Sequence, residues 1–439
     1  MRGDSTGVCD VPAHTFSQYT TTAQHPAGGV RRDVAHSSAD YRTLPQPKNV
    51  STKTLRLPVR QLLPALLLTL LPQLIGAQGL VEKITDLLEF NLGPAPADST
   101  AFRPKVVFAP IAYYQPNTSL GFGFGATLLF KPKGAGPETR TSNIPLGISY
   151  TLKNQIFASS SYTIFFPEEK WLLRGNLGYV DFPQDYYGVG NGTRDQDLLD
   201  ITYQQFIIEP LLLRQTLPGL FIGGGFRYNT YYNTELVEAT DRLPEGFDLQ
   251  DSLGSKSVGL EFAASYDTRD NLVNAERGVL AEFTHGFYGT ALGGSAKFQL
   301  SKLDTRSYRR LGPKSVIAGQ FYARYSTART PVQELSNLGG DERLRGFSEF
   351  RFRDRLALFG QAEYRWQTFE SIGFVFFGGV GQVAGNEADL GLGQLRYSVG
   401  TGLRVTVIPQ ENVNLRVDYG YGLGLSSGSG FYIGLGEAF

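Results

Sequence analysis

The sequence predicts an all-β protein: a sixteen-stranded antiparallel transmembrane β-barrel preceded by a short N-terminal helix. Apolar and polar residues alternate with a period of two almost throughout residues 105–439, which is typical of strands with one apolar and one polar face. The chain has 52 glycines, 23 tyrosines and 30 phenylalanines, a composition expected where strands pack closely and aromatic girdles flank a membrane. Short and long connections alternate along the chain, as they do when a barrel crosses a bilayer repeatedly.

Charge and rare residues exclude several classes of function. The 41 basic and 41 acidic side chains cancel, so no net field favours nucleic acid and we expect no nucleic-acid partner. Cys9 is the only cysteine, which excludes an internal disulfide and a thiolate metal site. Three of the four histidines precede the predicted barrel, and His285 shares a strand face with Phe283 and Phe287. Because catalysis by a nucleophile needs a paired base, we expect no enzyme, cofactor or metal.

The N-terminal region is predicted to direct export. Basic residues precede a leucine-rich run over residues 62–71, and small residues follow at 76–77, the layout of a secretory signal peptide over residues 50–77. The apolar run is too short for a transmembrane helix. Residues 1–49 are polar and have no hydrophobic period. They are either upstream sequence that is not translated, with initiation at Val50, or a disordered leader.

Residues 78–104 connect the signal peptide to the first strand. Apolar residues recur at helical spacing from Leu80 to Leu88, and prolines at positions 94 and 96 end the pattern. We therefore expect one short amphipathic helix over residues 80–90, which plugs the interior, lies on the membrane surface or serves as a linker.

The strand pattern extends from there to the C-terminus. In residues 413–423 the odd positions are apolar or aromatic, and the even positions are polar, charged or glycine. The same alternation over residues 258–267 turns Glu261 and Asp267 inward, whereas a soluble sandwich would expose its charges. Recurrent inward charge therefore favours a membrane barrel. The predicted strands lie near residues 105–115, 119–131, 142–152, 154–165, 170–181, 198–214, 219–232, 256–267, 278–289, 294–302, 315–327, 356–367, 372–383, 395–407, 412–424 and 430–439.

The lengths of the connections predict which side of the membrane each one faces. Short turns near residues 167–168, 215–219, 367–371 and 409–412 are expected to be periplasmic, and long connections over 182–197, 232–255, 328–355 and 384–394 external.

One external connection contains Arg345-Gly346-Phe347, which we name the lumen-lock motif. Glycine lets the backbone turn sharply, and a guanidinium can hold the connection inside a polar barrel if the wall offers a carboxylate.

The lumen-lock motif and its context resemble the BamA/TamA-like outer-membrane superfamily, also known as the bacterial surface antigen type of barrel. Further similar segments lie at residues 187–191, 266–270, 363–365 and 416–420. Their order and spacing across residues 105–439 carry the resemblance. It implies a bacterial outer-membrane location, contact with outer-membrane lipid, sixteen strands and a role in inserting or translocating proteins or lipids.

The resemblance also implies that the loop arginine is held by acidic residues on the twelfth and thirteenth strands. Glu363 has the inward parity required of the first acid. On the thirteenth strand, Gly379 stands where the family usually has aspartate. Another inward acid such as Asp418, or a backbone carbonyl, would then have to complete the site.

Residues 78–104 are also shorter than a single periplasmic receptor domain of the kind that inserting family members carry. We therefore expect a variant that lacks those domains. Two functions remain open: an insertion or translocation barrel for unfolded barrel clients, served by a separate periplasmic partner, or a structural or passive pore barrel without transport activity.

The C-terminal residues supply one more expectation. Phe431, Ile433, Leu435 and Phe439 are predicted to share one strand face, and an aromatic final residue resembles the signal that delivers barrels to the outer membrane. Glycines at positions 430, 434 and 436 leave this strand with few side chains to pack. Its pairing with the first strand is therefore expected to be weak enough to open.

Overall fold

The computed structural model describes residues 89–92, 103–115, 119–193, 199–238, 254–408, 412–424 and 428–439. This part of the chain is all-β, as predicted, and all of its named strands pair antiparallel. Its helices are single 3₁₀ turns, and among the described residues no helix is long and apolar enough to span a bilayer. The predicted leader and signal peptide lie outside the described residues.

The strands are β1 (Glu89–Asn91), β2 (Lys105–Gln115), β3 (Ser119–Phe130), β4 (Ser142–Thr151), β5 (Ile156–Phe165), β6 (Trp171–Tyr186), β7 (Leu199–Leu217), β8 (Leu220–Glu238), β9 (Ser255–Asp267), β10 (Gly278–Tyr288), β11 (Phe298–Gly312), β12 (Ser315–Ser326), β13 (Ser336–Leu338), β14 (Phe352–Asp354), β15 (Leu356–Gln367), β16 (Ile372–Ala384), β17 (Arg396–Ile408), β18 (Val413–Leu423) and β19 (Ser429–Leu435). The 3₁₀ turns are η1 (Pro167–Glu169), η3 (Thr290–Leu292), η4 (Val332–Glu334), η5 (Glu387–Asp389) and η6 (Leu392–Gln394).

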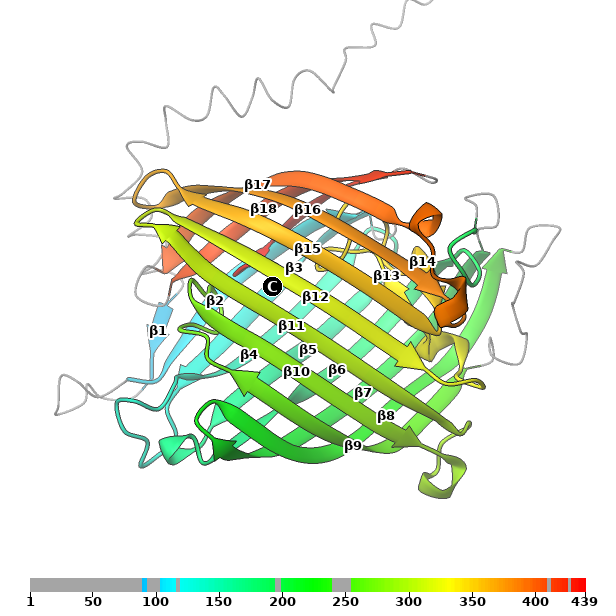
Figure 1. Ribbon diagram of the computed structural model, residues 1–439, viewed down its shortest axis with the longest axis horizontal. Helices are drawn as coiled ribbons and strands as arrows, with labels where there is room; N and C mark the ends of the chain where they lie inside the picture. The colour runs from blue at the N-terminus through cyan, green and yellow to red at the C-terminus, as the bar shows by residue number, and fades with distance from the viewer. Residues whose placement is uncertain are drawn as a thin grey trace, which may run out of the picture. The chain divides into compact units, whose positions relative to one another are not determined.

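The strands pair in chain order except where β12 pairs with β15 and β19 pairs with β2. Each strand from β2 to β12 pairs with the next, β12 pairs with β15, and sequential pairing then continues to β19. Among the described residues, β19 pairs with β2 through one register pair, Phe431 opposite Tyr114. Figure 1 shows the long strands crossing the view on a slant, with the yellow and orange strands β12, β15 and β16 in front.

The two faces of the sheet differ in the way that the alternation predicts. On β15, Glu363 and Arg365 are buried, whereas Tyr364 and Trp366 between and beside them are exposed. Phe124 of β3 is 63% exposed, although it is a large apolar residue. The apolar side chains thus cover the outside, and the charged side chains meet one another inside.

Several boundaries differ from those expected. The strand predicted over 294–302 runs instead as β11 over Phe298–Gly312, because residues beyond 302 continue in register with both β10 and β12. The short pair β13 and β14 lies inside the long connection after β12 and was not predicted.

The elements predicted for the two ends of the described chain also differ from those in the structure. Of the helix predicted over 80–90, residues 80–88 lie outside the described residues, and Glu89 and Phe90 belong to β1. This strand pairs with β2, and the rings of Phe90 and Phe108 meet edge to face at 5.5 Å. The last strand ends at Leu435 and not at 439, because Gly436 adopts φ +80° and turns the chain.

The connection between β9 and β10, residues 268–277, folds back across the interior. Leu272 packs against a cluster on β5 to β9 that includes Phe165 and Phe221. Val273 packs against Val107 and neighbouring residues, and Ala275 joins the cluster around Phe439. This connection therefore contacts strands from several parts of the sheet.

Candidate functional site

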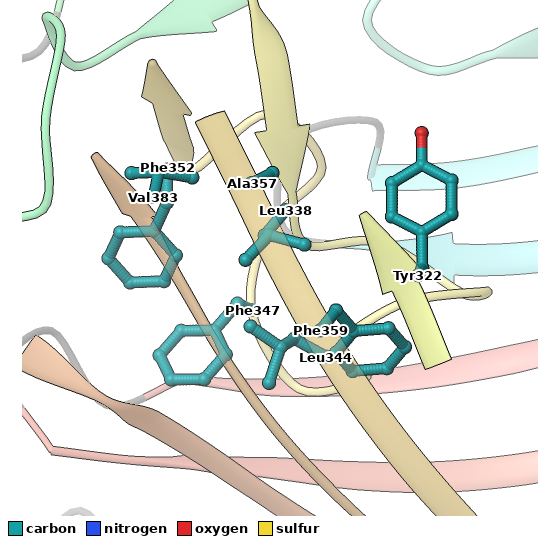
Figure 2. Close-up of a cluster of buried hydrophobic side chains, with 8 residues drawn as sticks. All are labelled: Tyr322, Leu338, Leu344, Phe347, Phe352, Ala357, Phe359 and Val383. Atoms are coloured by element: carbon teal, nitrogen blue, oxygen red, sulfur yellow. The ribbon is translucent and has the colours of Figure 1, made fainter. Parts of the chain in front are cut away.

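The long connection between β12 and β15, residues 327–355, is named here the lock connection. Its apolar side chains hold it inside the sheet. Leu338, Leu344, Phe347 and Phe352 from the connection form a buried cluster with Phe359 and other wall residues. Figure 2 shows Leu344 and Phe347 beside Phe359 of β15, with Val383 and Phe352 above them. This packing fixes the backbone on both sides of Arg345 and so positions its side chain.

Gly346 brings the lumen-lock motif against the wall. Its φ of +112° is unfavourable for residues with a Cβ, and a Cβ here would lie 2.4 Å from the amide nitrogen of Gly422. Glycines on β18 make room from the other side: a Cβ at Gly420 would lie 2.7 Å from the backbone carbon of Arg345. The Gly346 N–H donates to the Tyr432 hydroxyl of β19 at 3.0 Å.

The Arg345 side chain is fully buried and meets two carboxylates. Its guanidinium donates to Glu363 of β15, and Nη1 lies 2.6 Å from Oδ2 of Asp418 on β18. All three side chains are 0% exposed. The guanidinium also lies 3.5 Å from the ring centre of Phe377 on β16. A buried charge needs such partners, because desolvation costs several kcal/mol per ion.

Asp418 and Glu363 are shared with wall arginines. Arg404 Nη1 lies 2.5 Å from Asp418 Oδ1, and Arg365 Nη2 lies 3.0 Å from Glu363 Oε2. Both of these arginines also contact Glu437, at 2.7 Å from Arg404 Nε and 3.7 Å from Arg365 Nε. One ion network therefore joins the loop, the wall and the C-terminal residues.

The C-terminal residues enter this network and do not continue the strand. Arg365 Nη2 donates to a main-chain oxygen of Phe439 at 3.0 Å, and its guanidinium lies 5.5 Å from the Phe439 ring centre. Phe439 is buried against Tyr308 and Ala318. The expectation that Phe439 shares a face with Phe431, Ile433 and Leu435 is therefore wrong: those three lie on β19, whereas Phe439 follows the turn at Gly436 into the interior.

Gly379 leaves no acid on β16 at the position that the resemblance implied. A Cβ at Gly379 would lie 3.1 Å from both Cε2 of Phe359 and Oγ of Ser398. The second carboxylate comes from Asp418 instead, and Phe377 on β16 contributes its aromatic face.

Other long connections pack against the lock connection. Gly190 N–H donates to the Arg353 carbonyl at 2.7 Å, and Arg351 Nη1 donates to the Thr193 hydroxyl at 2.7 Å. Burial raises the pKa of Glu349, and Asp341 and Glu342 raise it further, to about 7.

A polar cavity of about 560 Å³ remains in the interior. Glu342 and Arg343 of the lock connection line it, as do Arg269 and Leu272 of the β9–β10 connection. The two connections therefore both border the same space.

Sequence reasoning missed four parts of the site: Arg404, Glu437, Phe377 and Tyr432. The alternation along its strand places Arg404 on the inward face, as it does Asp418 and Glu363. Because charged residues inside a barrel must be paired, this was a usable signal that Arg404 contacts an inward acid. Glu437 interrupts the apolar odd positions of residues 431–439, which was a usable signal that it leaves the apolar face, but its partners depend on the turn at Gly436.

Residues 139–439 match the model of the Omp85 superfamily domain. No curated protein sequence matches. The solved structure of BamA from Haemophilus ducreyi lacking POTRA domains 1–3 is 15% identical, with a TM-score of 0.48 and 75% of this chain and 70% of that chain covered. CdiB from Acinetobacter baumannii is 13% identical, with a TM-score of 0.48 over 75% of this chain and 59% of that chain. OccK10 (OpdN) from Pseudomonas aeruginosa is 10% identical, with a TM-score of 0.31 and coverage of 75% and 97%.

Proposed function

Because this chain belongs to the Omp85 superfamily of outer-membrane β-barrel proteins, we propose that it inserts or translocates proteins at the outer membrane through a seam between β19 and β2. Residues 105–439 would form a sixteen-stranded barrel of β2–β12 and β15–β19, in which the separate three-residue pair β13 and β14 is not counted. The lock connection would face outward from the cell, and the β9–β10 connection would face the periplasm.

The seam is the observation that carries the proposal. β18 and β19 stay in register from Leu415–Leu435 to Tyr421–Ser429, whereas one pair of described residues joins β19 to β2. β3 covers one edge of β2, and β1 pairs with Lys105–Val107 on the edge that faces β19. Backbone groups that remain unpaired along the two strand edges offer a template for a further strand. A client strand could pair there while it enters the membrane.

The ion network around Arg345 would hold β19 in its position beside β18. Tyr432 on β19 accepts from Gly346, and Glu437 just after β19 contacts Arg404 and Arg365. Release of the lumen-lock motif would therefore also remove contacts from β19. Phe431, Ile433 and Leu435 on β19 would serve as the delivery signal of this barrel itself.

Depletion of the protein tests the proposal. We expect the abundance of one or more outer-membrane barrels to fall in isolated membranes, with unfolded client barrels and a periplasmic partner recovered together with the protein. Unchanged abundance of every outer-membrane protein would reject insertion. That result would favour the second candidate, a structural or passive barrel, which the filling of the interior by residues 268–277 supports.

A further inference from the structure

The outer face of the sheet contains an apolar groove that the proposed function does not use. Its volume is about 460 Å³, and its lining comes from β2 to β7. Large side chains form the rims, among them Phe124, Leu146, Ile148, Leu177 and Tyr179. Three of these are strongly exposed, Phe124 at 63%, Ile148 at 57% and Leu146 at 55%. The groove is thus a recess in the apolar outer surface.

Small side chains on β5 create the recess. Ala158 stands in register with Ile148 of β4 on one side and Tyr179 of β6 on the other. Ser160, two residues along the same strand face, is in register with Leu177. The side chains on the outer face of β5 are therefore short here, whereas those of β4 and β6 on either side are large. The groove runs along β5 between them.

Ser160 makes the floor chemically distinct. The residue is 6% exposed, and its hydroxyl has no hydrogen-bond partner among the described residues. A buried hydroxyl in an apolar environment is unfavourable unless it is paired, and hydrocarbon around a membrane protein supplies no water to pair it. An occupant that brings an acceptor oxygen would satisfy it.

We propose that the groove binds one acyl chain of a membrane lipid and that Ser160 donates a hydrogen bond to an oxygen carried on that chain. The recess is continuous with the lipid-facing surface, so acyl chains are the molecules that surround it. A single flexible chain can reach a floor below the rims. The broad strand surface of a second copy would rest on the rims and leave Ser160 unpaired.

Native mass spectrometry of the folded barrel, extracted from its membrane in mild detergent, tests the proposal. We expect a lipid-bound species of the wild-type protein and its loss in Ala158→Phe, because the ring fills the recess. Ala323→Phe is the matched control: Ala323 faces outward on β12 between exposed Phe321 and Tyr325, outside the groove. Equal lipid retention in all three proteins would overturn the proposal.

A second variant keeps the test valid if Ala158→Phe does not fold. Delipidated barrel is offered lipid A with 3-hydroxyacyl chains, or phosphatidylethanolamine with unsubstituted chains. The wild type is expected to retain the hydroxylated lipid at least several-fold better, and Ser160→Ala to lose that preference. Equal retention of both lipids by the wild type would overturn the proposal. A wild-type dimer that Ala158→Phe converts to monomer would also overturn it, because a second copy would then occupy the groove.

Discussion

Arg345 and Asp418 lie 73 residues apart in the sequence, yet Nη1 of the arginine is 2.6 Å from Oδ2 of the aspartate, and neither side chain is exposed. Arg345 comes from a connection and Asp418 from the middle of a strand. Their contact places the lumen-lock motif against β18, next to the strand that forms the seam. The remaining partners, Glu363 and Arg404, extend this contact across the wall.

Loss of either member of the buried ion pair Arg345–Glu363 should destabilise the barrel. We predict that Arg345→Ala and Glu363→Gln each lower the temperature at which the folded band disappears on semi-native gels. Removing one partner of a buried ion pair typically costs about 3–5 kcal/mol, because the other charge stays buried. Arg309→Ala, at an exposed position on β11, is the control and should leave the transition unchanged. If all three variants behave like the wild type, Arg345 has no locking role.

Gly346 should tolerate no side chain. In Gly346→Ala the Cβ would meet the backbone of β18, and the positive φ would add strain, so we expect the lock connection to leave its seat. Limited proteolysis of intact cells should then cleave the connection faster than in the wild type. Gly391→Ala is the control, since its Cβ would find only Cγ of Gln394 at 3.9 Å. Equal cleavage rates for both variants would contradict this geometry.

Asp418, and not an acid on β16, should be the second carboxylate. We predict that Asp418→Asn lowers thermal stability and that Gly379→Asp added to it does not restore the loss, because a side chain at 379 crowds Phe359 and Ser398. Thermal unfolding followed by circular dichroism measures both. Full recovery in the double variant would mean that the two positions are interchangeable.

The seating of the lock connection should depend on pH through Glu349. Burial, followed by Asp341 and Glu342, raises its pKa to about 7, and Arg343 opposes the shift. A raised carboxyl pKa means that the seated state binds the proton more tightly than the released state. This contribution is present at pH values below the ordinary carboxyl pKa and is lost as pH rises through about 7. Proteolysis of the lock connection should therefore accelerate as pH rises from the ordinary carboxyl pKa to about 7. Glu349→Gln should flatten this dependence of the cleavage rate on pH. An unchanged profile in Glu349→Gln would assign the dependence to another group.

The sequence predicted the repetitive parts of the structure well and the irregular parts poorly. Period-two alternation identifies strands such as β15 and β18 because each residue faces one of two very different environments. It also predicts which way Glu363 and Asp418 point. The inward turn after Leu435 depends on one positive φ at Gly436, and in the sequence only Glu437 interrupts the apolar odd positions that continue to Phe439. The β13–β14 pair was missed because three-residue strands are too short to show a period.

The central claim is that this barrel acts by opening between β19 and β2. Cysteines at the register partners Phe431 and Tyr114, with Cys9 replaced by serine, would tie the two strands together on oxidation. The control pair, Phe431→Cys with Tyr419→Cys, ties the same residue to β18. Assembly of the client barrels identified by depletion should stop when the β19–β2 pair is oxidised, resume on reduction and proceed normally in the control. Normal client assembly with the β19–β2 pair fully cross-linked would contradict the account.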